Sequence, residues 1–130
     1  GLKYFLKDII KTKSEVLITG INDLKYNEAL PNFMPQYFKD LKKNGIKERV
    51  ITAKKSGIFL FENETTEYKF LEQKEFNPTN TFIYGDKVVI VSWSIPITAI
   101  MLKNNELAET YKAHFEVLWE KAERKKIQLS

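Results

Sequence analysis

The sequence is almost without histidine and cysteine, the two residue types that most often serve as nucleophiles, general bases and zinc ligands. The chain contains one histidine, His114, and no cysteine, so disulfides, thiolate nucleophiles and zinc–thiolate sites are excluded. His114 stands between Tyr111 and Trp119 at the border of an apolar helical stripe, a position typical of a partly buried packing histidine. A general base would need a polar partner, and the sequence offers none. We therefore expect no catalytic residue, no metal site and no cofactor.

The best candidates for ligand binding are Ser92, Trp93 and Ser94, at the end of an apolar strand that is followed by Pro96. In α/β sheets, ligands commonly bind where strands end. An aromatic ring beside two hydroxyls suits a small polar ligand such as a sugar, and the alternative is a tryptophan used for packing. Because alternate strand residues face opposite sides, the two serines should share a face while Trp93 points away.

A loop that contains Glu62, Glu64 and Glu67 carries a group of carboxylates. Such oxygens can bind a divalent cation, but this spacing is more typical of a solvated loop. The sequence has no glycine-rich phosphate loop, no nucleophile elbow and no zinc signature.

The element that would position the candidate ligand site is a hairpin over Thr81–Ser94. Gly85 and Asp86 form its turn, which is a good hairpin signal. The unbroken run Val88–Val91 is typical of a central strand that is buried on both faces.

The rest of the chain predicts helices and strands that cover or extend this hairpin. Asn44 and Gly45 should end one helix and lead into a strand, which indicates a crossover and parallel pairing of the first two strands. Asn104 and Asn105 offer an N-cap for the last helix, and Arg124, Lys125 and Lys126 would complement its C-terminal dipole. We expect helices over Leu2–Lys13, Leu24–Leu30 and Pro35–Lys43, strands over Glu15–Thr19, Ile46–Ala53 and Ile97–Leu102, an edge strand over Tyr68–Leu71, a strand or short helix over Ile58–Phe61, and a final helix with the apolar stripe Leu107, Tyr111, Phe115, Leu118, Trp119 and Ala122. The fold class is α/β, a mixed sheet flanked by helices.

Length and composition predict one domain over residues 1–130. Of the 130 residues, 43% are hydrophobic, which is ample for a core. No apolar run is long enough to cross a bilayer, and we expect a cytoplasmic protein without a membrane partner. The net charge of +4 comes from lysines interleaved with glutamates. That pattern favours an ordinary solvated surface, so we expect weak DNA binding or none from this chain alone.

Three segments, together with the order of elements, resemble one half of the phospholipase D superfamily fold, from about Glu15 to Ala122. EVLIT (15–19) resembles the family's opening strand, and KKNGIKERVI (42–51) resembles its helix, small turn and strand. FIYGDKVVIVSWS (82–94) resembles the strand of the active-site motif, followed by a strand that ends in a glycine-serine-x-asparagine pattern.

The resemblance implies that the catalytic motif has been lost. That motif is a histidine, any residue, a lysine, four residues and an aspartate, and its histidine attacks phosphorus. Alignment places Pro78 at the histidine, Asn80 at the lysine and Gly85 at the aspartate. Ser92 matches the serine of the second pattern, and Ser94 replaces its asparagine. The chain should therefore be inactive as a phosphodiesterase, while Asn80 joins Ser92, Trp93 and Ser94 at the rim of the former cleft as predicted ligand-binding residues.

Degenerate domains of this kind resemble the C-terminal effector-sensing part of TrmB-type archaeal transcriptional regulators. The resemblance implies a non-catalytic domain that senses a small molecule such as a sugar. DNA would be bound only by a winged helix-turn-helix absent from this chain, and Gly1 in place of methionine fits an excised domain. We also expect a homodimer, because the apolar side of Leu2–Lys13 and the aromatic final helix would expose more than one domain can cover. The alternatives are a dimeric phosphodiesterase or nuclease of the same superfamily, and a purely structural dimerisation module.

Overall fold

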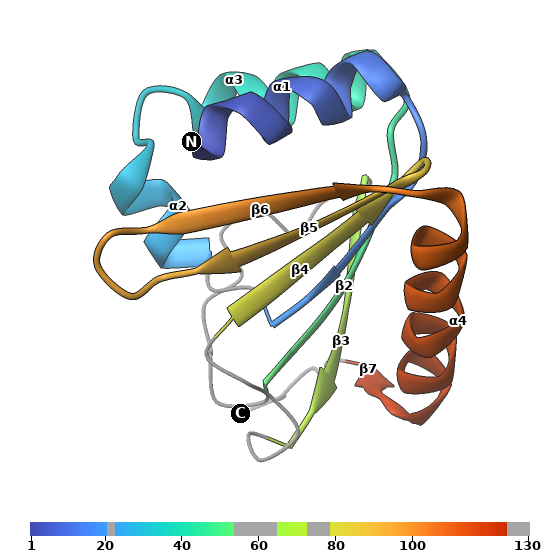
Figure 1. Ribbon diagram of the computed structural model, residues 1–130. Coiled ribbons are helices and arrows are strands. Elements are labelled where there is room, and N and C mark those ends of the chain that lie inside the picture. The colour runs from blue at the N-terminus through green and yellow to red at the C-terminus, as the bar shows by residue number, and fades with distance from the viewer. Residues whose placement is uncertain (21–22, 54–64, 73–78, 125–130) are drawn as a thin grey trace, which may run out of the picture.

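A mixed sheet of seven strands lies at the centre of the computed structural model, which describes residues 1–20, 23–53, 65–72 and 79–124 (Figure 1). The strand order is β6-β5-β4-β1-β2-β3-β7. β1 pairs with β2 and β2 with β3 in parallel, while the other neighbours pair antiparallel. The predicted α/β class with a mixed sheet is confirmed. In chain order the elements are α1 (Leu2–Thr12), β1 (Val16–Thr19), α2 (Asp23–Ala29), α3 (Met34–Lys43), β2 (Glu48–Ala53), β3 (Thr66–Leu71), β4 (Thr79–Tyr84), β5 (Lys87–Ser92), β6 (Thr98–Lys103), α4 (Asn105–Lys121) and β7 (Glu123–Arg124).

The predicted crossover between the first two strands is confirmed. α3 ends at Lys43 with Asn44 as its C-cap, and Gly45 takes a left-handed φ of 66° that only glycine adopts without strain. The N–H of Gly45 then donates to the Lys42 carbonyl, and the N–H of Ile46 donates to the Leu41 carbonyl. These bonds satisfy carbonyls at the helix end and turn the chain into β2, which lies parallel to β1.

The predicted hairpin is formed by β4 and β5, which pair in register from Thr79↔Ser92 to Tyr84↔Lys87 around Gly85 and Asp86. Val88, Val89 and Val91 are fully buried, as the β-branched run predicts. The central position of this run was wrong, however, because β1 occupies the middle of the sheet and β5 lies second from its margin. Helices cover both sides of the sheet, which buries the three valines, while Ile90 on the α4 side is only partly buried.

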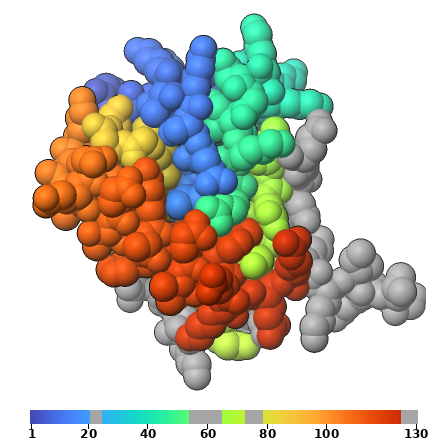
Figure 2. Space-filling model, turned by 90° about the vertical axis from the view of Figure 1, so that its right-hand side faces the viewer, coloured from blue at the N-terminus to red at the C-terminus, as the bar shows by residue number. Residues whose placement is uncertain are grey.

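Two hydrophobic clusters lie on opposite faces of the sheet. On one face α1, α2 and α3 pack over Phe82, Tyr84, Val89 and Val91. On the other face Ala108 and Phe115 of α4 pack over strand residues such as Ile51, Ile83 and Val88. Figure 2 views the molecule from the side of α4, whose orange and red residues spread below the blue and green segments of α1, β1 and α3.

The apolar side of α1 is covered by its own domain. Leu2, Phe5, Leu6 and Ile9 are all buried in the first cluster, and Phe5 meets Phe82 edge-on at 4.8 Å between ring centroids. This helix therefore does not offer its apolar side to a second copy, contrary to one reason given above for expecting a dimer.

Asn104 caps α4 as predicted, because its side-chain oxygen accepts the N–H of Leu107 at 3.0 Å. Leu107 was wrongly placed in the buried stripe: it is 42% exposed, and Ala108 is buried instead. The helix ends at Lys121, so Arg124 belongs to β7 and does not serve the helix dipole.

β3 was predicted to be an edge strand, but Glu123 and Arg124 of β7 pair with Phe70 and Lys69 beyond it. The separate strand predicted after Pro96 is confirmed as β6. The segment Ile58–Phe61 and residues Lys125 and Lys126 lie outside the described residues. Within the described ranges, no helix combines the length and apolar character needed to cross a membrane.

Candidate functional site

Strand ends gather at one rim of the sheet, where the sequence predicted a ligand site. β1 ends at Thr19, which pairs with Ile51 of β2 and with Thr81 of β4. β5 ends there too, since Ser92 pairs with Thr79 at the start of β4. Gly20, the residue after β1, lies so close to β4 that a Cβ added to it would be 2.9 Å from the Thr79 carbonyl oxygen. Glycine at this position therefore allows β1 and β4 to meet at the rim.

Asn80 is fully buried at this rim, on the face covered by α2. Its Oδ1 accepts a hydrogen bond of 2.9 Å from the hydroxyl of Tyr26 on α2. Its Nδ2 is buried and has no hydrogen-bond partner among the described residues. A buried amide N–H without a partner costs about 1–3 kcal/mol, so Asn80 holds an unused donor at the predicted site.

Trp93 lies beside the same tyrosine. Its ring meets that of Tyr26 edge-on at 4.8 Å, and the Lys25 ammonium lies 5.7 Å from the ring centroid. The indole Nε1 is buried and, like Nδ2 of Asn80, has no hydrogen-bond partner in the described part of the chain. Asn80 pairs with Val91, and Trp93 follows two residues later, so both side chains face the same side of the sheet. Two unused N–H donors and one cation thus surround Tyr26.

The two serines lie apart from these donors. The hydroxyls of Ser92 and Ser94 are 2.9 Å apart and hydrogen-bond to each other, and Ser94 is exposed. Ser92 alternates with Val91 and Trp93 along the strand, which directs it to the α4 side. The structure therefore brings Asn80 and Trp93 together and separates them from Ser92 and Ser94. Tyr26 and Lys25, which complete the cluster, were not anticipated from the sequence.

The structure describes two of the three positions that align with the catalytic motif. Asn80 is bound to Tyr26, Gly85 lies in the hairpin turn, and Pro78 is outside the described residues. His114 is exposed on α4, on the opposite face of the sheet from Asn80. The expected partly buried packing role of His114 is therefore wrong, because the helix turns this residue toward solvent. The predicted acidic loop is wrong for Glu67, which lies in β3 next to β2 and pairs with Arg124 at 3.1 Å. Glu62 and Glu64 lie outside the described residues.

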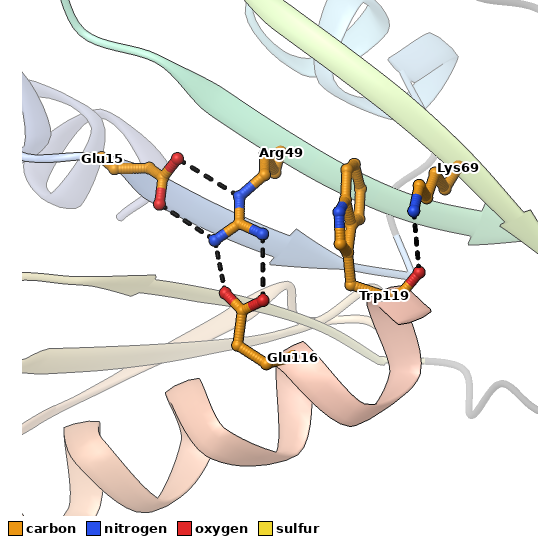
Figure 3. A network of polar contacts seen from close by, with 5 residues as sticks. All are labelled: Glu15, Arg49, Lys69, Glu116 and Trp119. Atoms are coloured by element: carbon orange, nitrogen blue, oxygen red, sulfur yellow. Dashed lines mark hydrogen bonds and ion pairs between the residues drawn. The ribbon is translucent and has the colours of Figure 1, made fainter. Parts of the chain in front are cut away.

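A polar network fastens α4 to the sheet (Figure 3). The Arg49 guanidinium donates to both oxygens of Glu15, at 3.1 and 3.2 Å, and to both oxygens of Glu116. It also lies 5.3 Å from the Phe115 ring centroid and 5.2 Å from that of Trp119. The hydrogen bond from Arg49 is the main reason that the pKa of Glu116 is lowered. Every polar group of Arg49 is thus engaged within the fold, so this network serves structure.

A small cavity lies between the sheet and the helices that cover this face, and Tyr26 is part of its lining. Its volume is about 20 Å³, and it is lined by Tyr26, Tyr37, Glu48, Tyr68 and Phe82 together with aliphatic residues. Burial, and next the nearby Glu48 carboxylate, raises the pKa of Tyr37 well above its ordinary value. A space of this volume holds about one water molecule, so it is too small for a sugar.

Comparisons with known proteins agree in architecture only. No protein-family model matches the chain, and no curated protein matches its sequence. TrmBL2, an archaeal chromatin protein whose structure shows a novel mode of DNA binding, superposes with a TM-score of 0.64 at 16% identity, over 95% of this chain and 50% of its own. Nuc from Salmonella typhimurium, a phospholipase D family member, superposes with a TM-score of 0.68 at 13% identity, over 97% of this chain and 91% of its own.

The chain has a phospholipase D-like fold. The predicted resemblance, including that to a TrmB-type protein, is thereby confirmed at the level of fold. The chain spans half the length of TrmBL2 and corresponds to nearly all of Nuc.

Proposed function

We propose that this phospholipase D-like domain is a non-catalytic sensor of a small polar molecule and a dimerising part of a DNA-binding regulator. The observation that supports the sensor role most directly is the pair of buried, unused donors around Tyr26, Asn80 Nδ2 and Trp93 Nε1. A ligand oxygen that accepts from both would recover the free energy that these groups lose in the unliganded domain. The Lys25 ammonium beside the indole favours an oxygen-rich ligand further.

The proposal that the domain is not an enzyme rests on the composition of the former motif. Asn80 replaces a lysine and is bound to Tyr26, and Gly85 replaces an aspartate in the turn. The single histidine of the chain lies on α4, across the sheet. Because this histidine lies far from Asn80, the histidine-based covalent phosphoryl transfer of the phospholipase D motif would have no first step. Hydrolysis of a generic phosphodiester by the purified chain, lost in Asn80→Leu, would overturn this part of the proposal.

The link to DNA rests on the likeness to TrmBL2. The chain covers half of that DNA-binding protein, and its own basic residues are dispersed. We propose that DNA is bound through a winged-helix segment of a longer protein, while this domain responds to the effector. Sequence-specific duplex binding by this chain alone at physiological salt, with a steep salt dependence, would contradict that division.

The sensor role is tested by a thermal-shift screen of sugars and nucleotides. A ligand at 100 times its dissociation constant should add about 2.7 kcal/mol to the free energy of unfolding. Trp93→Phe keeps an aromatic ring but removes the indole N–H, and we expect it to weaken binding about tenfold, as for one lost hydrogen bond. Ser92→Ala and Ser94→Ala are the controls on the other face of the strand. If Trp93→Phe and Asn80→Leu both fold and bind as the parent does, the site lies elsewhere.

A further inference from the structure

The outer edge of β6 is open for pairing with another strand. In the described part of the chain β6 pairs only with β5 and lies at one margin of the sheet (Figure 1). The N–H of Asn104, just after β6, donates to the Asp86 carbonyl at 2.9 Å, and hydrogen-bonding direction alternates along a strand. The backbone groups of Ala99, Met101 and Lys103 therefore point away from β5.

This edge lacks the features that usually block one. Exposed edge strands normally carry central charges, a proline or a bulge, because an open edge invites pairing. β6 has the sequence TAIMLK, whose only charge is Lys103 at its end. Its register with β5 is continuous from Lys87↔Lys103 to Ser92↔Thr98, so no bulge twists the edge away.

Exposed aliphatic side chains lie along and at both ends of the same edge. Ile100 in the middle of β6 is 53% exposed. Before the strand, Ile95 is 96% and Ile97 is 47% exposed, and after it Leu107, in the first turn of α4, is 42% exposed. Leaving four such residues in water along one edge forgoes hydrophobic stabilisation, which indicates a surface that a partner covers.

We propose that a second copy of this chain pairs with β6 antiparallel, around a two-fold axis at Ile100. This inference rests on the dimerisation part of the proposed function and assigns its surface. In this register the outward backbone groups of Ala99 bond those of Met101 of the partner subunit, and Ile100 meets the partner's Ile100. The two-fold dimer thus gives the outward backbone N–H and C=O groups of β6 hydrogen-bond partners and joins the two sheets.

The register explains why the occupant is a second copy. Pairing around Ile100 sets Lys103 opposite the partner's Ile97, so the single charge of the strand meets no like charge. The segment with Ile95 and Ile97 then runs toward the partner's Leu107, at the start of its α4. The exposed aliphatic residues at the two ends of the edge therefore lie next to each other, twice in one dimer. An unrelated strand would have to supply this complementarity by coincidence.

Because the chain has no cysteine, a single introduced cysteine reports the register. The backbone groups of Ile100 point to β5, so a pair at the axis would be of the non-hydrogen-bonded type, with Cα atoms about 4.5 Å apart. That separation lies at the short end of the disulfide range. Under mild oxidation we expect Ile100→Cys to form a covalent dimer. Val117→Cys, at a 68% exposed aliphatic position on α4, should remain uncrosslinked.

The matching charge test is Ile100→Lys, with Val117→Lys as its control. At tens of micromolar, sedimentation should give a dimer for the parent and for Val117→Lys, and a folded monomer for Ile100→Lys. If the parent is a dimer but Ile100→Lys is also a dimer, or Ile100→Cys does not crosslink, then dimerisation stands and the proposal that β6 forms the interface is wrong. A monomeric parent would overturn both, and circular dichroism establishes that each variant is folded.

Discussion

The hydroxyl of Tyr26 donates to Oδ1 of Asn80 across 54 positions of sequence, at a distance of 2.9 Å. Both side chains are buried, and the tyrosine ring also meets Trp93 at 4.8 Å and Phe82 at 5.8 Å. Phe82 in turn meets Phe5 of α1. Tyr26 is therefore the residue through which α2 contacts both proposed ligand-binding side chains, and the aromatic contacts continue from there to α1.

The first prediction compares two buried tyrosines that differ in hydrogen bonding. Tyr26→Phe removes the hydroxyl that donates to Oδ1 of the buried Asn80, so the free energy of unfolding should fall by about 1–3 kcal/mol. Tyr37→Phe removes a hydroxyl that has no partner among the described residues and should be neutral or stabilising by up to about 1 kcal/mol. Urea denaturation of both variants measures the contrast. Equal losses would contradict it.

The hairpin and the crossover could be predicted because their signals are local. Gly85-Asp86 between β-branched runs specifies a two-residue turn, and Asn44-Gly45 specifies a helix end. Asn80 was found only through the resemblance to a catalytic motif. Tyr26 was missed because it lies in a segment rich in turn-forming residues, and its hydroxyl bond to Asn80 depends on tertiary packing.

The pairings that involve the end of the chain were likewise beyond local signals. Glu123 and Arg124 form β7 only because α4 returns the chain to β3. Leu107 fits the apolar stripe by spacing, yet the helix begins at the margin of the sheet, where nothing in the described part of the chain covers it fully. The spacing of apolar residues predicts which face of a helix is buried, but it does not predict how far the sheet extends beneath that face.

The second prediction concerns the two glycines that end β1 and α3. Both have positive φ, 75° at Gly20 and 66° at Gly45. A Cβ at Gly45 would meet nothing within 4 Å, whereas one at Gly20 would lie 2.9 Å from the Thr79 carbonyl oxygen. Gly45→Ala should cost about 1 kcal/mol for its backbone conformation, and Gly20→Ala clearly more. Thermal denaturation that ranks them the other way would refute the close approach of β1 and β4.

The third prediction tests the network of Arg49. Its two carboxylate partners are about half exposed, so each pair should contribute under about 1 kcal/mol. The two aromatic rings beside it add about 0.5–1 kcal/mol each. Arg49→Ala should therefore lower the free energy of unfolding by about 2 kcal/mol. Arg124→Ala, which removes a 74% exposed arginine paired with Glu67, should cost under about 0.5 kcal/mol. Denaturant unfolding measures both variants. If Arg49→Ala and Arg124→Ala lower the free energy of unfolding by similar amounts, the Arg49 network does not fasten α4 to the sheet.

The last prediction uses the pH dependence of the contact between α1 and the hairpin. Asp8 accepts from Lys87 at 2.6 Å and from Tyr84 at 2.9 Å. Burial alone would raise the pKa of Asp8, but the hydrogen bonds from Lys87 and Tyr84 outweigh it and leave the pKa below its ordinary value of 3.8. Asp8 therefore stays ionised to a lower pH in the folded chain than in the unfolded chain. By linkage, the resulting stability is fully present above the ordinary pKa and is lost as the pH falls through the folded-state pKa.

Asp8→Asn should therefore destabilise the domain by a constant amount from about pH 5 to 7. Below about pH 4 the difference in free energy of unfolding from the parent should shrink, because the parent loses the same charge. Urea denaturation at a series of pH values measures this difference. Lys87→Met supplies the control in a double-mutant cycle: its cost in the parent should largely disappear in the Asp8→Asn background at pH 7. A difference between parent and Asp8→Asn that persists unchanged at pH 3 would mean that Asp8 acts through packing and not through its charge.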